Sequence, residues 1–166
     1  MKVLCAIVLL LTPWVAASAA QGSGGADFVN IFHKYCYAFK DQNAASAERN
    51  LERSGQFRNP QFEDAYEIFV GNIDYAVTPQ NHDCTTDVLL KHNGQILFTQ
   101  TQIMSRLIKQ YGLRETNRRI FQDVALNNRN TKIQQTDFIG NTGHSYRLLY
   151  PLNNQDSYYM TFTIDW

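Results

Sequence analysis

Two stretches in the first half of the chain have apolar residues at spacings of three and four, the pattern of one buried helix face, and a polar stretch between them is weakly periodic. The clearest stretch is 28–39, where Asp27 can cap the first turn. The weakly periodic stretch predicts a short helix at 47–53 that stops near Gly55. The second apolar stretch covers 60–70, where a proline suits the first turn and Gly71 follows the last apolar residue. The pattern therefore predicts three helices in this half of the chain.

A hairpin followed by a helix is the strongest local signal in the sequence. Apolar residues flank Asn93-Gly94 on both sides, and this dipeptide accepts the positive φ values of a tight hairpin turn. Thr99 and Gln102 then have the spacing of a capping box, and an amphipathic run ends at Gly112. We expect a hairpin that leads directly into a helix.

Alternation of apolar and polar residues predicts strands in the rest of the chain. Ile73, Tyr75 and Val77 alternate with polar residues before Pro79. Four later strands form an expected meander: 119–126, 132–139, 145–150 and 157–166. In the last of them every second residue is apolar, as in a sheet with one covered face. Helices followed by such a meander indicate an α+β domain.

The N-terminus has the three parts of a secretory signal peptide at 1–20. A basic start at Lys2 precedes an apolar run at 3–11, and small residues follow at the cleavage site. The apolar run is shorter than the roughly 20 residues that span a membrane. We expect cleavage after residue 19 or 20, a flexible linker at 21–26 and a single domain at 27–166. The mature protein is then secreted and has no membrane contact.

The net charge limits which partners the protein can bind, and the cysteine content indicates the cellular compartment in which it folds. The chain has 15 basic and 15 acidic residues, so it has no basic field to attract nucleic acid. Removal of the leader takes away Cys5 and leaves Cys36 and Cys84. In an oxidising compartment two such cysteines are most simply joined, although two buried free thiols are an alternative. We expect a Cys36–Cys84 disulfide and no nucleic-acid partner.

Residues 28–39, 62–70 and 90–107 together resemble the NTF2-like family. The last segment, with Asn93-Gly94 and the helix after it, looks like the small hairpin that leads into the third helix of that family. The resemblance implies an α+β fold, with N-terminal helices packed on a curved antiparallel sheet in an NTF2-like or cystatin-like cone. It also implies a pocket that different members use for small apolar ligands, for isomerase or dehydratase chemistry, or for protein binding, often as dimers. A lipocalin-like barrel is the competing architecture, favoured by the aromatic content and the late strands.

Aromatic residues are the candidates for the walls of such a pocket. Concave apolar sites bind small ligands, and tyrosine hydroxyls add polar contacts within them. The candidates are Tyr66, Phe69, Tyr75, Phe121, Tyr158 and Phe162. Ordinary core packing is the alternative explanation for each of them.

Asp74, Asp87 and His92 are the acid–base candidates if the protein is an enzyme. Such chemistry needs an ionisable group in an apolar cavity, where burial moves its pKa toward neutrality. Alternation puts Asp74 on the opposite side of its strand from Tyr75. Asp87 is expected at the start of a strand and His92 beside a tight turn, so exposed surface positions explain all three candidates more simply.

Metal and cofactor chemistry have little support in the sequence. His82, Asp83, Cys84 and Asp87 are zinc-ligand types, but no matching second pair accompanies them and Cys84 is better used in a disulfide. We predict no metal and no cofactor.

The sequence favours a secreted, non-catalytic binding or interaction module. Its expected partner is a small apolar ligand in an aromatic-lined cone, or another protein. An isomerase-like or hydratase-like enzyme acting on a small apolar substrate and a lipocalin-like ligand carrier are the alternatives. A homodimer that uses the sheet surface around Tyr150 and Tyr159 is a further interpretation.

Overall fold

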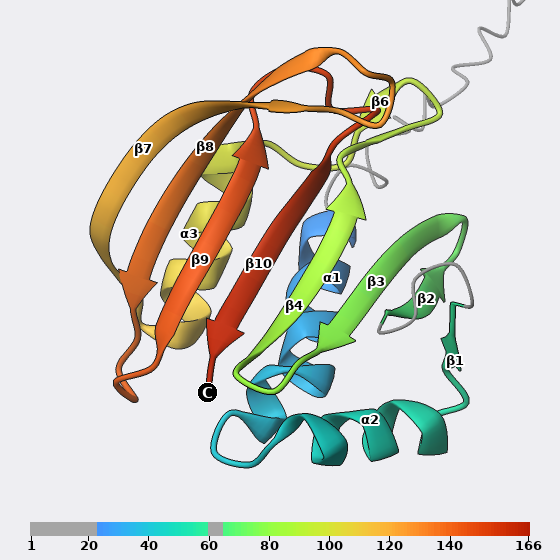
Figure 1. Ribbon diagram of the computed structural model, residues 1–166, viewed down its shortest axis with the longest axis vertical. Coiled ribbons are helices and arrows are strands. Elements are labelled where there is room, and N and C mark those ends of the chain that lie inside the picture. The colour runs from blue at the N-terminus through green and yellow to red at the C-terminus, as the bar shows by residue number, and fades with distance from the viewer. Residues whose placement is uncertain (1–22, 60–64) are drawn as a thin grey trace, which may run out of the picture.

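The computed structural model describes residues 23–59 and 65–166. The expected signal peptide at 1–20 lies outside these residues. Within these ranges eight strands form one antiparallel sheet in the order β1-β2-β3-β4-β10-β9-β8-β7, and Figure 1 shows its strong curvature. The strands are β1 (Phe57–Arg58), β2 (Tyr66–Val70), β3 (Ile73–Pro79), β4 (Asp83–Leu89), β7 (Arg114–Val124), β8 (Asn130–Ile139), β9 (Ser145–Pro151) and β10 (Tyr159–Asp165). The predicted α+β architecture is confirmed.

The helices pack on one face of this sheet. They are α1 (Ser23–Tyr35), α2 (Ala44–Arg53) and α3 (Gln100–Tyr111), with a short 3-10 turn η1 (Tyr37–Phe39) after α1. Figure 1 shows α1 and α3 behind the sheet and α2 below it. No helix among the residues that the structure describes is long and apolar enough to cross a membrane.

Aromatic side chains form much of the core between the helices and the sheet. The ring of Phe32 lies 4.6 Å from that of Phe162 and 5.5 Å from that of Tyr111, measured between ring centroids. Phe28 and Tyr75 are 6.4 Å apart. These are ordinary distances for packed aromatic pairs. The interior is therefore built from mutual aromatic contacts.

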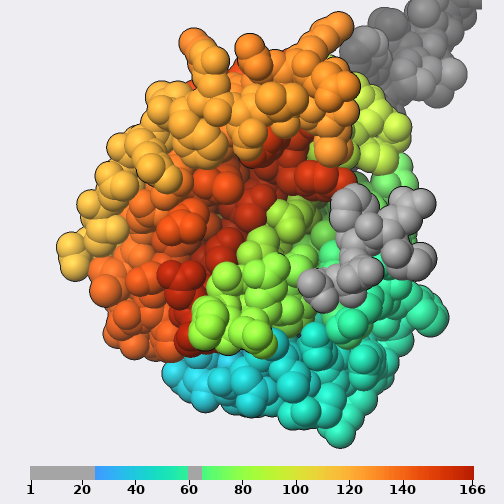
Figure 2. Space-filling model, in the orientation of Figure 1, coloured from blue at the N-terminus to red at the C-terminus, as the bar shows by residue number. Residues whose placement is uncertain are grey.

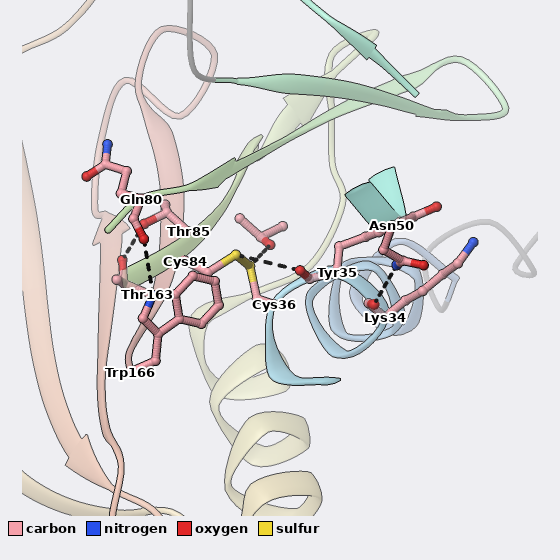
Figure 3. The surroundings of a disulfide bond; sticks show 10 residues. Lys34, Tyr35, Cys36, Asn50, Gln80, Cys84, Thr85, Thr163 and Trp166 are labelled. Atoms are coloured by element: carbon pink, nitrogen blue, oxygen red, sulfur yellow. Dashed lines mark hydrogen bonds between the residues drawn. A yellow bond between two sulfur atoms is a disulfide. The ribbon is translucent and has the colours of Figure 1, made fainter. Parts of the chain in front are cut away.

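The disulfide between Cys36 and Cys84 is confirmed, with Cα atoms 5.4 Å apart. Both cysteines are fully buried. The bond joins the end of α1 to β4 in Figure 3, where the amide of Asn50 in α2 also donates to the backbone carbonyl of Lys34 at 3.4 Å. Residues from two helices and the sheet are thus fixed together at one end of the core.

The predicted hairpin and helix are also confirmed. Asn93 and Gly94 have φ values of 48° and 79° between β5 (Lys91–His92) and β6 (Gln95–Ile96), which form a separate two-stranded sheet. Thr99 caps α3 with a complete capping box, and Gly112 ends the helix in the left-handed conformation. The turn and cap residues were sufficient to predict these local structures.

The third helix predicted from the sequence is wrong, because residues 66–70 form β2. Tyr66 and Ile68 are buried whereas Phe69 is 64% exposed, so the side chains alternate as in a strand. Gly71, with a φ of 63°, belongs to the tight turn into β3. Aromatic and β-branched residues favour this pairing over a helix. Residues 66–70 of the middle segment of the NTF2-like resemblance therefore form a strand rather than a helix, and residues 60–64 of the predicted helix lie outside the described part of the chain.

The first helix begins earlier than expected. Its first residue is Ser23, so the latter part of the expected linker at 21–26 is helical. Gly25 is buried, and a Cβ atom there would meet the side chain of Phe98 at 3.5 Å. The helix therefore begins before Asp27 and packs near Phe98 at Gly25.

Candidate binding groove on the open face of the sheet

The side of the sheet that faces away from the helices contains a groove. We call this side the open face; it carries Glu67, Asp74 and Asp87 on neighbouring strands. The groove has a volume of about 350 Å³. In Figure 2 it is the hollow between the orange residues that join β7 to β8 and the green residues of β3 and β4. Concave sites of this size are where proteins bind small molecules.

Strand register sets four side chains in one row across the open face: Glu67, Ala76, Asp87 and Thr161. Glu67 pairs with Ala76, Ala76 pairs with Asp87, and Asp87 pairs with Thr161. Neighbouring strands lie about 4.8 Å apart, so the Cα atoms of Glu67 and Asp87 are roughly 10 Å apart. The small Ala76 side chain leaves room between them. Asp74 lies two residues along β3 on the same face, and we call Glu67, Asp74 and Asp87 around Ala76 the carboxylate site.

One wall of the groove is formed by the end of β7 and the residues just after it. Val124 and Leu126 present apolar side chains there that are 57% and 66% exposed. The hydroxyl of Tyr158 donates to the carboxylate of Asp123 at 2.7 Å. The backbone N–H of Leu126 donates to the carbonyl of Ser157 at 2.8 Å. These bonds hold the apolar wall against the start of β10, so the groove combines a fixed apolar wall with the carboxylate site.

The ionisable groups of the groove respond to burial and to one another. Burial raises the pKa of Asp87 to about 6, although the hydroxyl of Thr161 donates to its Oδ1 at 2.6 Å and lowers the value. Burial also raises the pKa of Asp74, and the charge of Glu67 adds to that rise. The pKa of the Tyr159 phenol is raised by burial and by the three carboxylates. Among the described residues that line the groove, none is Lys, Arg or His.

Most of the aromatic candidates lie outside this groove. Three are buried core residues on the helix side of the sheet: Tyr66, Tyr75 and Phe162. Phe69 is exposed on β2, and Phe121 lies on the edge strand β7. Tyr158 lines the groove. The structure thus brings one of the six candidates to the groove and uses three in the core.

The acid–base candidates are distributed differently. Asp74 and Asp87 both line the groove, whereas His92 lies in β5 and is not among the lining residues. The expected position of Asp87 at the start of a strand is wrong, because β4 begins at Asp83. Asp87 lies between β3 and β10, and pairing on both sides makes it partly buried rather than exposed. In the described part of the chain, no cluster of metal-ligating side chains has a geometry suited to a metal ion.

Sequence reasoning missed Glu67, Ala76 and Thr161. A signal for Thr161 was present, because the alternation of β10 puts it opposite the buried Met160 and Phe162. Glu67 was hidden by the incorrect helix assignment. The row itself forms only when β4 pairs with β10, and those strands are far apart in the sequence.

No family model, curated protein or solved structure matches this chain. The function of the protein is therefore inferred from the geometry and chemistry of the groove.

Proposed function

We propose that this protein is a secreted, non-catalytic binding module that holds a small ligand in the groove on the open face. The groove itself carries this proposal, because its fixed apolar wall and its carboxylate site lie around one concave volume of about 350 Å³. Secretion is supported by the signal-peptide pattern and by the disulfide, which suits an oxidising compartment.

The groove is a better ligand site than the aromatic interior. Interior rings such as Phe32 and Phe162 contact each other at 4.6 Å, whereas the groove is open to solvent at Val124 and Leu126. A ligand with an apolar part gains contacts with this wall without disturbing the core. The sequence predicted a small apolar ligand inside the cone, on the helix side of the sheet. The ligand site proposed here lies on the opposite face.

A fragment screen followed by amide NMR tests the proposal. Bound fragments are expected to shift the amide signals of residues such as Ala76 and Thr161, and Ala76→Leu is expected to abolish binding by filling the space between the carboxylates. The control Thr85→Leu places the same leucine side chain on β4, on the same face, at a residue that does not line the groove. Fragments that shift only other regions, or that bind the Ala76→Leu variant unchanged, would contradict the proposal.

An acid–base enzyme of the isomerase or hydratase kind is the second candidate. The raised pKa of Asp87, about 6, favours it, because a general base works best when its pKa is near the working pH. Such an enzyme would exchange a carbon-bound hydrogen of its ligand with deuterium from D₂O, and Asp87→Asn would stop that exchange. Bound ligands that exchange no hydrogen leave the binding module as the function.

The other sequence-based interpretations differ in their support. A lipocalin-like carrier is not proposed. In the described residues β1 and β7 are the two edge strands of an open sheet, whereas the sheet of a lipocalin closes into a barrel. The NTF2-like relationship and a homodimer or other protein partner stay predictions.

A further inference from the structure

We propose that the ligand of the groove is a small organic cation, with an ammonium group at the carboxylate site and a compact apolar or aromatic body against the wall. This inference rests on the proposed binding function. It names the chemical class of the ligand and the residues that select it.

The described residues place no Lys, Arg or His side chain between the three carboxylates, which lie around an open space above Ala76. Glu67 and Asp87 lie on either side of Ala76 across the sheet, and Asp74 lies on the same face two residues along β3. The Ala76 methyl group is the smallest side chain that a strand can offer apart from glycine. An ammonium group above Ala76 would therefore have carboxylates on three sides.

The hydrogen bonds already present leave these charges unneutralised. Glu67 accepts from the neutral side-chain amide of Asn59, and Asp87 accepts at Oδ1 from the neutral hydroxyl of Thr161. Within 23–59 and 65–166, no residue donates a hydrogen bond to Oδ2 of Asp87 or to the carboxylate of Asp74. Glu67 and Asp87 are partly buried, whereas Asp74 is exposed. A partly buried carboxylate without a cationic partner is costly, so a bound cation would remove that cost at Glu67 and Asp87.

The spacing favours an organic cation over a metal ion. Calcium needs six to eight oxygens at about 2.3–2.6 Å. Glu67 and Asp87 are separated by a whole strand, and no suitable metal-ligand cluster occurs among the described side chains. An ammonium group donates to several oxygens at about 2.8 Å without such strict geometry.

The rest of the groove suits the body of such a ligand. Val124 and Leu126 offer apolar contact, and Tyr158 and Tyr159 line the same volume. Aromatic rings attract cations as well as apolar groups. A volume of about 350 Å³ is at the small end for ligand sites, so the ligand is a compact molecule.

Calorimetric titration of the oxidised protein with three probes of similar shape tests the ligand class: phenethylammonium, neutral 2-phenylethanol and anionic 3-phenylpropanoate. We expect phenethylammonium to bind at least about tenfold more tightly than the other two, as charge-assisted hydrogen bonds require. Asp87→Asn and Glu67→Gln should each weaken its binding about tenfold. Asp83→Asn, which removes a carboxylate on β4 outside the groove, should change binding less than about twofold.

Each other outcome overturns the inference. Equal or tighter binding of either control probe in the groove would contradict a cation-selective site while leaving the proposed binding function standing. Absence of binding by all three probes would also contradict the inference, and the fragment screen would decide separately whether the groove binds anything. Amide NMR spectra and thermal unfolding of each variant establish that it is folded.

Discussion

Replacing Asp87 with asparagine should stabilise the protein at neutral pH. Asparagine has nearly the same shape and keeps an oxygen that accepts from Thr161, so the substitution mainly removes the charge. The pKa of Asp87 is about 6 in the folded protein against 3.8 for an ordinary aspartate. Each pKa unit corresponds to about 1.4 kcal/mol, so the ionised Asp87 lowers the free energy of unfolding by about 3 kcal/mol.

The pH dependence follows from the direction of that pKa change. Below pH 4 Asp87 is protonated in both the folded and the unfolded chain, so the variant and the native protein should be similar in stability. Between about pH 4 and pH 6 the folded state binds more protons than the unfolded state, and the native protein loses stability as the pH rises. Above pH 6 the variant should keep its full advantage of about 3 kcal/mol.

Urea unfolding at a series of pH values from 3.5 to 8 measures this difference directly. Asp137→Asn is a control of opposite sign. Burial raises the pKa of Asp137, but hydrogen bonds from Gln135, Arg147 and Asn117 outweigh that effect and leave it below the usual value. Asp137→Asn should therefore lose stability at neutral pH, with a smaller loss as the pH falls toward 3.5. If Asp87→Asn gives no gain between pH 4 and pH 8, the account of a dehydrated, unneutralised Asp87 is refuted.

Three further stability predictions concern the disulfide and the two caps of α3. Replacing Cys36 and Cys84 together with alanine should lower the free energy of unfolding by about 4 kcal/mol in urea titrations, because the bond closes a loop with a sequence separation of 48; a loss below 1 kcal/mol would contradict this. Gly112→Ala should lower the melting temperature more than Gly143→Ala. Both positions have positive φ, but a Cβ atom at Gly112 would overlap the side chain of Asn141 at 1.9 Å. Equal losses of melting temperature would refute the role of that contact. Thr99→Ala should cost about 1 kcal/mol of unfolding free energy by removing the cap of α3, and no loss would show that the cap is dispensable.

The parts of the fold that could be predicted depend on short-range chemistry. The caps of α3 at Thr99 and Gly112 are determined by residues close to them in the sequence, and so is the turn at Asn93. The alternation of β10 shows directly in its side chains. The pairing of Cys36 with Cys84 was predicted from the oxidising compartment and from the even number of cysteines in the mature chain, without knowledge of the distance between them.

The strand at 66–70 shows where local reasoning fails. Apolar residues at spacings of three and four also occur in a short strand with an exposed aromatic residue, here Phe69. Only pairing with β3 decides between the two structures.

The groove was harder still to predict from the sequence. Its carboxylates come from three strands, and Asp87 becomes partly buried only because β10 pairs with β4 from the other end of the chain. The two acidic candidates, Asp74 and Asp87, were identified individually, whereas their common site around Ala76 depends on long-range register.

A structure of the protein with phenethylammonium bound tests the central claim most directly. The ammonium nitrogen is predicted to lie above Ala76, within hydrogen-bond distance of a carboxylate oxygen of Asp87 or Glu67, with the ring against Val124 or Leu126. An ammonium group bound elsewhere on the protein, or a ring buried among the aromatic residues on the helix side of the sheet, would contradict the account.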